Sequence, residues 1–412
     1  MIRLGFVVHS LQPGGIERSV TRIVAGLDRE LFEPTVICLE RSGPAAAWLP
    51  NDVPVVEIKK RAGNDLGSVL RLANELRSRK IDLVQSHNWG TLIETVTARK
   101  WGGIQAHIHA ERGTVMGTLG SGGVRGRLRA LAMRTALRSV DLVTSNAHAV
   151  ARRVENRCAY PADKIKIIPN GIAGYGCHDH KYHRNQIRKN LGIDNNTLLI
   201  GAIGRLHPVK GFDILVTAFS KLSVSHPDVH LVIVGDGQQR PDLENRINLD
   251  GVSDRIHLVG HHDRVEGWLK SFDLFVNSSR SEGMSQSMVE AMSVGLPIVA
   301  TDVGDASRMI VHRPEACGIT CPPENDQLLA EAMARLLDDF ALRTEYSANG
   351  RRIHERYYGV ETFNQSMEKL YLDTMNDSQR GENQLRGVRL LATADALQSC
   401  GKSAKNEGSA GK

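Results

Sequence analysis

The sequence predicts an α/β protein in which two doubly wound, Rossmann-like domains face one another across a cleft. Two observations carry this prediction. Short apolar runs alternate with amphipathic stretches along the first 358 residues, an order typical of parallel sheets with helices on both faces. The chain of 412 residues is also too long for one ordinary hydrophobic core, so two domains are expected.

The first domain is predicted over residues 1–172. Its strands are expected at 2–8, 34–39, 53–58, 82–87, 104–110, 141–145 and 165–168. Its helices are expected near 15–29, 66–79, 91–101, 127–139 and 147–157. Because doubly wound sheets bind ligands at the carboxyl ends of their strands, a ligand site is expected there.

The second domain is predicted over residues 191–358 and repeats the pattern. Its strands are expected near 198–203, 229–234, 256–259, 273–277, 297–301 and 318–321. Its helices are expected near 211–223, 240–249, 265–270, 286–294, 325–338 and 341–356.

Residues 173–190 are predicted to link the two domains. The Pro-Asn-Gly turn at 169–171 precedes them, and the segment is rich in glycine, histidine and asparagine. A metal site is an alternative, because the segment contains Cys177, His178, His180 and His183. No second cluster completes a zinc pattern, so the linker is the preferred interpretation.

Composition favours a soluble globular protein without a membrane span, since no apolar run approaches about 18 residues. The N-terminal run Ile2–Val8 is interpreted as a strand and not as a signal peptide. Six scattered cysteines favour a reducing cytoplasm. Aromatic residues make up only 5% and none interleave with the basic runs, so nucleic-acid binding is not expected.

The stretch 281–305 forms a loop, a helix and a strand directly after an apolar strand. Gly283 lets the loop backbone approach a ligand, and the helix beginning near Ser285 offers free N–H groups to an anion. Glu282 and Glu290 lie eight residues apart. Two acids beside an anion site suit a ligand with both hydroxyls and a diphosphate. The alternative is a capping box at 287–290 and a solvated loop acid at Glu282.

A second loop, 204–211, follows the first strand of the second domain and contains Arg205 and Lys210. Two cations in a loop before a helix neutralise a diphosphate without a metal. They also stabilise the charge that develops on a departing diphosphate. The alternative is a pair of surface cations around a turn.

Glycines mark two further strand-to-helix turns. Gly14 and Gly15 follow the first strand and open a helix, which allows close approach of backbone N–H groups to a phosphate or sugar. Gly235 lies after the strand at 229–234 and serves either donor approach or simple turn formation. No GxGxxG sequence occurs, so a nicotinamide cofactor is not supported.

Taken together, these motifs resemble the retaining glycosyltransferases of family 4, and the resemblance covers residues 1 to about 375. The family has a Glu-x7-Glu signature, a G-R-L-x-x-x-K-G loop and a Gly-Gly-x-Glu turn. The resemblance implies the GT-B fold, with a C-terminal helix near 360–375 that crosses back onto the first domain. After Met375 the periodicity is lost, and 376–412 is predicted to be disordered.

The resemblance also implies roles for the residues that match these motifs. Glu282 and the backbone of Gly283, Met284 and Ser285 are expected to bind the donor sugar, and Glu290 the ribose. Arg205 and Lys210 are expected to bind the diphosphate, and Gly15 to lie across the cleft beneath it. No Asp-x-Asp occurs in the sequence, so hexosyl transfer with neither a metal nor another cofactor is expected. The leaving phosphate is expected to accept the acceptor's proton.

One position departs from the family pattern. Relatives often read Thr-Glu-His-Gly where this chain has Ala-Glu-Arg112-Gly. There the family's histidine lines the acceptor side of the cleft. Either Arg112 supplies a fixed positive charge at that place, or His109 takes the contact.

Residues 112–157 contain nine arginines and two acids. In the stretch 124–138, arginines alternate with leucines and a methionine, which allows peripheral contact with an anionic membrane surface at its cytoplasmic face. A lipid-linked acceptor would then be within reach. The alternative is an ordinary helix with a solvated basic face.

The acceptor is expected, by family analogy alone, to be a precursor of a polysaccharide or glycolipid of the cell envelope. Two other functions remain open. One is a nucleotide-sugar epimerase or hydrolase on the same fold, and the other is a non-catalytic nucleotide-sugar binder.

Overall fold

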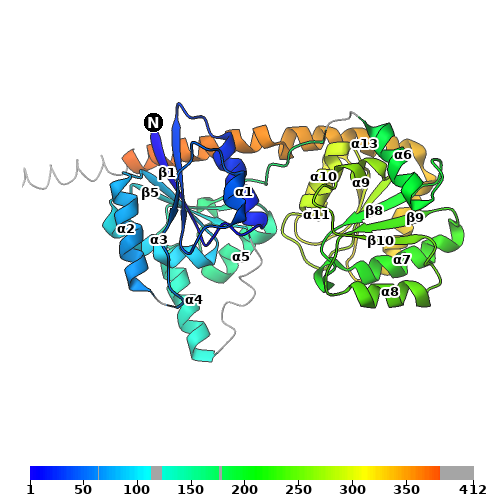
Figure 1. The fold of residues 1–412 in the computed structure, drawn as a ribbon, viewed down its shortest axis with the longest axis horizontal. Coiled ribbons are helices and arrows are strands. Elements are labelled where there is room, and N and C mark those ends of the chain that lie inside the picture. Colours follow the sequence, from blue (N-terminus) through cyan, green and yellow to red (C-terminus); the bar gives the residue numbers. More distant parts are fainter. Residues whose placement is uncertain (64, 113–122, 176–178, 381–412) are drawn as a thin grey trace, which may run out of the picture.

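The protein consists of two α/β domains, and Figure 1 shows them side by side in the computed structural model. The structure describes residues 1–63, 65–112, 123–175 and 179–380. Part of the loop at 117–123 and two of the candidate metal ligands, Cys177 and His178, lie outside these residues, as does 381–412, where the sequence predicts disorder.

The first domain is built on a seven-stranded parallel sheet with the order β3-β2-β1-β4-β5-β6-β7. Its strands are β1 (Ile2–Val8), β2 (Phe32–Cys38), β3 (Val55–Glu57), β4 (Leu83–His87), β5 (Ala106–Glu111), β6 (Leu142–Ser145) and β7 (Ile165–Ile167). Its helices are α1 (Gly15–Gly26), α2 (Leu66–Ser78), α3 (Trp89–Gly102), α4 (Gly123–Leu137) and α5 (His148–Cys158).

The second domain is built on a six-stranded parallel sheet with the order β10-β9-β8-β11-β12-β15. These strands are β8 (Leu199–Ile203), β9 (His230–Val234), β10 (Ile256–Gly260), β11 (Leu274–Asn277), β12 (Ile298–Thr301) and β15 (Gly318–Cys321), with a small hairpin of β13 (Val311–His312) and β14 (Glu315–Ala316). The helices are α6 (His180–Leu191), α7 (Phe212–Ser225), α8 (Arg240–Leu249), α9 (Glu266–Ser271), α10 (Gln286–Val294), α11 (Ala306–Ile310), α12 (Asp326–Asp338) and α13 (Phe340–Ile353).

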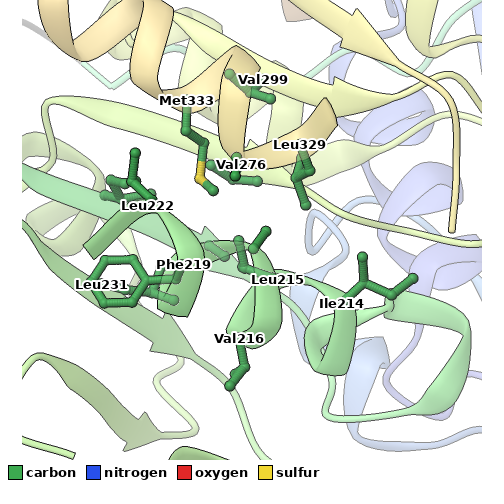
Figure 2. Close-up of a cluster of buried hydrophobic side chains, with 14 of the residues drawn as sticks. Ile214, Leu215, Val216, Phe219, Leu222, Leu231, Val276, Val299, Leu329 and Met333 are labelled. Carbon is green, nitrogen blue, oxygen red and sulfur yellow. The ribbon is translucent and has the colours of Figure 1, made fainter. Parts of the chain in front are cut away.

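Both sheets are covered on both faces, which is why their strands are almost continuously apolar. In the second domain, α7 and α12 pack on one face of the sheet. Figure 2 shows Phe219 and Leu222 of α7 and Met333 of α12 in this layer with Val276 of β11. Phe219 has no exposed surface. Its truncation to alanine is expected to cost about 3–5 kcal/mol of folding free energy.

The C-terminal helix returns to the first domain. It is helical over 360–380, and its apolar face packs into the core formed by β1, β2 and α1. The Tyr371 hydroxyl donates a hydrogen bond to Gln85 of β4, and its ring packs edge-on against Phe6. The helix therefore continues five residues beyond the predicted end of the ordered chain at residue 375.

The predicted linker at 173–190 is partly wrong, because all of its second half lies within α6. This largely polar helix is anchored by a buried charge, and its last residue, Leu191, packs against the core of the second domain. The Arg188 guanidinium is fully buried and donates to Asp273, at the start of β11, over 2.6 Å. Among the described residues, no group of three or more histidine, cysteine or acidic side chains is placed to hold a metal.

The basic helix α4 extends away from the first sheet in Figure 1. Three of its apolar side chains are strongly exposed: Val124 (73%), Leu128 (61%) and Leu131 (60%). Within the described part of the chain, no helix is both long and apolar enough to cross a bilayer.

Candidate active site in the interdomain cleft

The loops that carry the predicted motifs lie at the two points where the strand order reverses. In the first sheet this point lies between β1 and β4, and in the second between β8 and β11. Parallel sheets open a crevice at such points, outside the carboxyl ends of the strands. The turn at 14–15 follows β1, and the loops 204–211 and 278–285 follow β8 and β11.

Two glycines hold the loops of the second domain against each other. Gly211 has a φ of +63°, and a Cβ there would lie 2.2 Å from the Ser278 carbonyl oxygen. Gly235 has a φ of +148°, and a Cβ there would lie 1.9 Å from the Gly204 carbonyl oxygen. Any side chain at either position would push the loops apart. Gly235 therefore shapes the 204–211 loop and is not itself exposed to the cleft.

Lys210 and Glu282, which the sequence assigns to different parts of one ligand, are paired with each other. The Lys210 ammonium group donates to Glu282 Oε1. The Ser279 hydroxyl donates to the same oxygen over 2.8 Å. The two motif loops thus meet through a partly exposed ion pair.

Arg205 has no such partner. Its side chain is exposed on the 204–211 loop, and it makes no ion pair within the described ranges. An unpaired cation next to an ion-paired lysine makes this loop attractive to a multiply charged anion.

The helix α10 begins directly behind Glu282. Its first residue is Gln286 and its N-cap is Ser285, whose side chain makes no capping hydrogen bond. The free N–H groups of the first turn are therefore available to a ligand. The capping-box interpretation is wrong, because residue 287 lies inside the helix and not at its N-cap.

Glu290 lies farther along α10 and faces the first domain. Burial raises the pKa of its carboxyl group, and the positive charges of Arg22 and Arg18 on α1 oppose that rise. The Arg22 guanidinium also donates to the Gly171 carbonyl over 2.9 Å. Burial, and then the negative charge of Glu290, raise the pKa of Tyr175 to about 12. Glu290 is thus separated from Glu282 and borders α1 and residues 171–175.

The two domains enclose a pocket of about 260 Å³, which we call the inner pocket. It is lined by Gly15, Ile16, Arg112, Asn146, Val150, Asn170, Glu282, Gly283, Met284 and Gln286. Gly15 lies opposite the start of α10, and a Cβ on it would be 3.8 Å from the Gln286 side-chain nitrogen. Of the residues singled out in the sequence, the inner pocket gathers five: Gly15, Arg112, Glu282, Gly283 and Met284.

Arg112 supplies the positive charge of the inner pocket from the end of β5. Its guanidinium donates to the Asn170 side-chain oxygen and lies over the Phe363 ring, 5.7 Å from the centroid. The Nε group is buried and has no hydrogen-bond partner among the described residues. Burial lowers the pKa of Arg112 to about 10, which leaves the group charged at neutral pH.

His109 lies away from the inner pocket. Its side chain is fully buried within β5, and its Nδ1 is 2.8 Å from the Ser86 hydroxyl. The ring also packs 5.8 Å from Trp89. Of the two alternatives left open by the sequence, the structure brings Arg112 into the pocket and keeps His109 in the sheet.

A polar contact joins the domains beside the inner pocket. Asp305, the N-cap of α11, accepts hydrogen bonds from the backbone N–H groups of His148 and Ala149, at 2.6 and 2.8 Å. His148 Nδ1 lies 3.0 Å from the same carboxylate. No side chain of the first domain caps α5, so an acid of the second domain satisfies the free end of that helix.

Sequence reasoning did not find Asn146, Val150, Asn170, Asp305 or Gln286. Asn170 carried a signal, since it belongs to the Pro-Asn-Gly turn. Gln286 and Asp305 lie within the stretch 281–305 but were given no role there, and Asn146 and Val150 follow β6 without a distinctive motif. The residues of the first domain become site residues only because the second domain closes over them.

Comparison with known proteins supports the assignment of both halves. Residues 13–173 match the family model for "Glycosyltransferase Family 4". Residues 197–339 match the model for "Glycosyl transferases group 1". Together these ranges span most of both domains.

Two curated relatives show how far the similarity extends. The lipopolysaccharide core biosynthesis mannosyltransferase LpsB of Rhizobium meliloti is 28% identical over 217 residues, which cover 50% of this chain and 62% of LpsB. An Escherichia coli enzyme, UDP-Gal:alpha-D-GlcNAc-diphosphoundecaprenol alpha-1,3-galactosyltransferase, is 25% identical over 382 residues, 87% of this chain and 94% of that one. Other relatives match over a shorter part: the aligned segment spans 58% of the alpha-D-kanosaminyltransferase of Streptomyces kanamyceticus.

Solved structures share the fold. The Anabaena protein HepE in complex with UDP superposes with a TM-score of 0.75 at 21% identity, covering 90% of this chain and all of HepE. WaaG, a glycosyltransferase of lipopolysaccharide biosynthesis, superposes with a TM-score of 0.65 at 19% identity, covering 87% of this chain and 97% of WaaG. The predicted GT-B arrangement of two Rossmann-like domains is confirmed. The chain belongs to the group 1 glycosyltransferases, in family 4.

Proposed function

We propose that this protein is a retaining, metal-independent glycosyltransferase that moves a hexosyl group from a nucleoside diphosphate sugar to an acceptor hydroxyl. The observation that carries the proposal is the Lys210–Glu282 ion pair at the mouth of the cleft, with Arg205 and the uncapped start of α10 beside it. Cations and free N–H groups bind a diphosphate, and a carboxylate accepts hydrogen bonds from sugar hydroxyls.

The donor would exchange partners with this pair. Its diphosphate binds Lys210 and Arg205, and Lys210 leaves Glu282. The Glu282 carboxylate is then available to the sugar hydroxyls. Glu290 lies farther along the same helix and takes the ribose hydroxyls. In the empty site, Lys210 compensates the charge of the Glu282 carboxylate. Once Lys210 moves to the diphosphate, the carboxylate can accept hydrogen bonds from the sugar hydroxyls.

In the reaction, the bond between the anomeric carbon and the leaving phosphate oxygen breaks. The acceptor oxygen forms its bond to the same carbon on the same face, and its proton passes to the departing phosphate. Lys210 and Arg205 stabilise the developing phosphate charge. This role requires no metal, and the sequence has no Asp-x-Asp pair to hold one.

The first domain closes the site. Gly15 lies opposite Gln286, and because it has no side chain, the backbone of the turn at 14–15 can approach a diphosphate held at the start of α10. The contact of Asp305 with α5 favours the closed arrangement. Closure excludes water and limits hydrolysis of the donor.

A glycan or lipid-linked acceptor is the acceptor class we propose. The names of two relatives specify a lipopolysaccharide core and a diphosphoundecaprenol-linked sugar. On α4, the exposed Val124, Leu128 and Leu131 lie among exposed arginines such as Arg127 and Arg134. This combination suits peripheral contact with an anionic bilayer, where a lipid-linked acceptor would lie.

Thermal melting tests the donor assignment. The purified protein is melted with UDP, GDP and ADP and with their hexose derivatives, in the presence of a chelator. A ligand at 100 times its Kd adds about 2.7 kcal/mol of stability. We expect a shift with one nucleotide series, retained in the exposed-lysine control Lys221→Ala and lost in Lys210→Ala. No shift in any series, or an undiminished shift in Lys210→Ala, would contradict the proposal.

A further inference from the structure

A second pocket, of about 450 Å³, lies between the domains next to the inner pocket, and we call it the outer pocket. Its size is that of a site for a small ligand. Two of its lining residues, Asn146 and Met284, also line the inner pocket. The Met284 sulfur accepts a hydrogen bond from the Asn170 backbone N–H over 3.3 Å. A flexible methionine side chain therefore divides two neighbouring spaces.

The outer pocket carries uncompensated positive charge. Arg308 of α11 and Arg356, in the short π-helix His354–Tyr358 that follows α13, both line it and are both exposed. Neither forms an ion pair with any residue that the structure describes. The one lining carboxylate, Asp305, is occupied by the amide groups of α5 and by His148. Two arginines without a counter-ion at one pocket favour an anionic ligand.

An aromatic surface completes the pocket. The Tyr357 ring is 38% exposed and stacks on His312, with ring centroids 4.5 Å apart and planes 14° from parallel. The Arg356 guanidinium lies 5.3 Å from the Tyr357 centroid. Burial lowers the pKa of His312, so this imidazole is neutral at pH 7 and adds no charge. A partly exposed aromatic side chain beside guanidinium groups suits a sugar ring that carries an anionic substituent.

We propose that the outer pocket binds an anionic sugar unit of the acceptor, a sugar phosphate or a sugar acid. This inference rests on the proposed transferase function and gives its acceptor a chemical class. The anionic group binds Arg308 and Arg356, and the sugar ring contacts the exposed part of Tyr357. The adjoining part of the acceptor passes Met284 and brings its hydroxyl to Glu282 in the inner pocket.

The location explains why such an acceptor would assist closure. The outer pocket is lined from the first domain by His148 and Pro169 and from the second by Arg308 and Met309. A ligand held by both walls binds only the arrangement in which Asp305 contacts α5. Acceptor binding therefore favours the closed cleft.

The test measures binding and not turnover. The donor site is first saturated with the nucleoside diphosphate that gives the largest melting shift. Glucose 1-phosphate, glucuronate and glucose are then titrated by ligand-observed NMR. We expect at least one of the two anionic sugars to bind at least tenfold more tightly than glucose. Which one binds distinguishes a phosphate from a carboxylate.

Three variants locate that binding. Arg308→Gln and Arg356→Gln should each weaken the anionic probe about tenfold, the loss of one charge-assisted contact. Arg335→Gln, an exposed arginine on α12 outside the pocket, is the control and should change nothing. Both pocket arginines are exposed, so melting temperatures and nucleotide binding should stay at the wild-type level. Tyr357→Leu should weaken both the anionic probe and glucose.

The proposal is overturned if neither anionic sugar binds better than glucose, or if the two arginine variants bind as the wild type does. Loss of the probe in Lys210→Ala with retention in both arginine variants would place it at the donor site and would also overturn the proposal. The donor assignment is tested separately, because nucleotide binding should survive in Arg308→Gln and Arg356→Gln whichever way the sugar titration turns out.

Discussion

The two domains contribute to the cleft in different ways. In the second domain, the site residues lie on the loops after β8 and β11, which are neighbouring strands of the sheet, and they contact one another, as Lys210 and Glu282 do. In the first domain, the lining residues come from separate turns after β1, β5, β6 and β7 and are brought together only by the fold. We expect the compact motif of the second domain to bind the donor, which many enzymes share. We expect dispersed residues, including those of the first domain, to bind the acceptor, which is particular to one enzyme.

Loss of the lysine in the second domain should have the largest effect. In Lys210→Ala we expect transfer, measured as kcat/KM for the donor, to fall by about 10²–10³-fold, because the cation that stabilises the departing phosphate is removed. Lys221→Ala, on α7, is the matched control. A loss of less than about threefold would show that the compact motif is not the donor site.

Glu290→Gln tests whether Glu290 binds the ribose hydroxyls of the donor. The wild type should bind the ribonucleotide about tenfold more tightly than its 2′-deoxy analogue, and the variant should lose that preference. Isothermal titration measures both affinities. An unchanged preference for the ribonucleotide in the variant would exclude Glu290 from the ribose site.

The difference in melting temperature between Glu290→Gln and the wild type should depend on pH. Burial raises the folded-state pKa of Glu290, so the folded protein binds this proton more readily than the unfolded chain does. The buried charge therefore destabilises the ligand-free protein at neutral pH, and this penalty disappears as the pH falls below the unfolded-state value. Glu290→Gln should melt at a higher temperature than the wild type at pH 7 and at a similar temperature near pH 4. An equal difference at both pH values would contradict this.

Arg112→Gln tests the other side of the cleft. We expect the KM for the acceptor to rise about tenfold while nucleotide affinity is unchanged, because the guanidinium lies on the wall supplied by the first domain. Arg112→Lys retains the charge but loses the planar array of N–H donors. Its KM for the acceptor should lie between that of the wild type and that of Arg112→Gln. A larger effect on nucleotide affinity than on the acceptor KM would assign Arg112 to the donor.

Leu128→Glu tests whether α4 contacts a membrane. Binding to vesicles containing anionic lipid should fall several-fold, because an exposed apolar contact is replaced by a repelled charge. Leu249→Glu, on α8 of the second domain and 87% exposed, is the control. Equal vesicle binding by the wild type and Leu128→Glu would leave α4 as an ordinary solvated helix.

Asp305→Asn should have the smallest effect. The amide oxygen still accepts one of the two hydrogen bonds from the start of α5, but the NH2 group cannot accept the other and the charge that favours a helix N-terminus is lost, so about 1 kcal/mol of stability should be lost. For domains of this size that corresponds to a fall of about 2–4 °C in Tm. Unaltered melting would show that the contact between the domains is not stabilising.

The same contrast explains what the sequence could predict. Most strands and helices lie within a few residues of their expected positions, because long apolar runs specify parallel strands. The helix α6 was not predicted, because it is anchored by the buried guanidinium of Arg188. The partner of Arg188, Asp273, lies far along the chain, so no local pattern indicates the contact. The loops around Lys210 and Glu282 were found from local motifs. The neighbours of Glu290 on α1 and the lining residue Asn146 depend on how the domains face each other, which no local pattern encodes.

The division between donor and acceptor sides is tested most directly by titrating the nucleoside diphosphate into the wild type, Lys210→Ala and Arg112→Gln by calorimetry. Each variant removes one positive charge, and the two charges lie on opposite walls of the same cleft. We expect affinity to fall by about tenfold or more in Lys210→Ala alone. An equal loss in Arg112→Gln would contradict the division, and it would mean that a charged side chain of the first domain also binds the diphosphate.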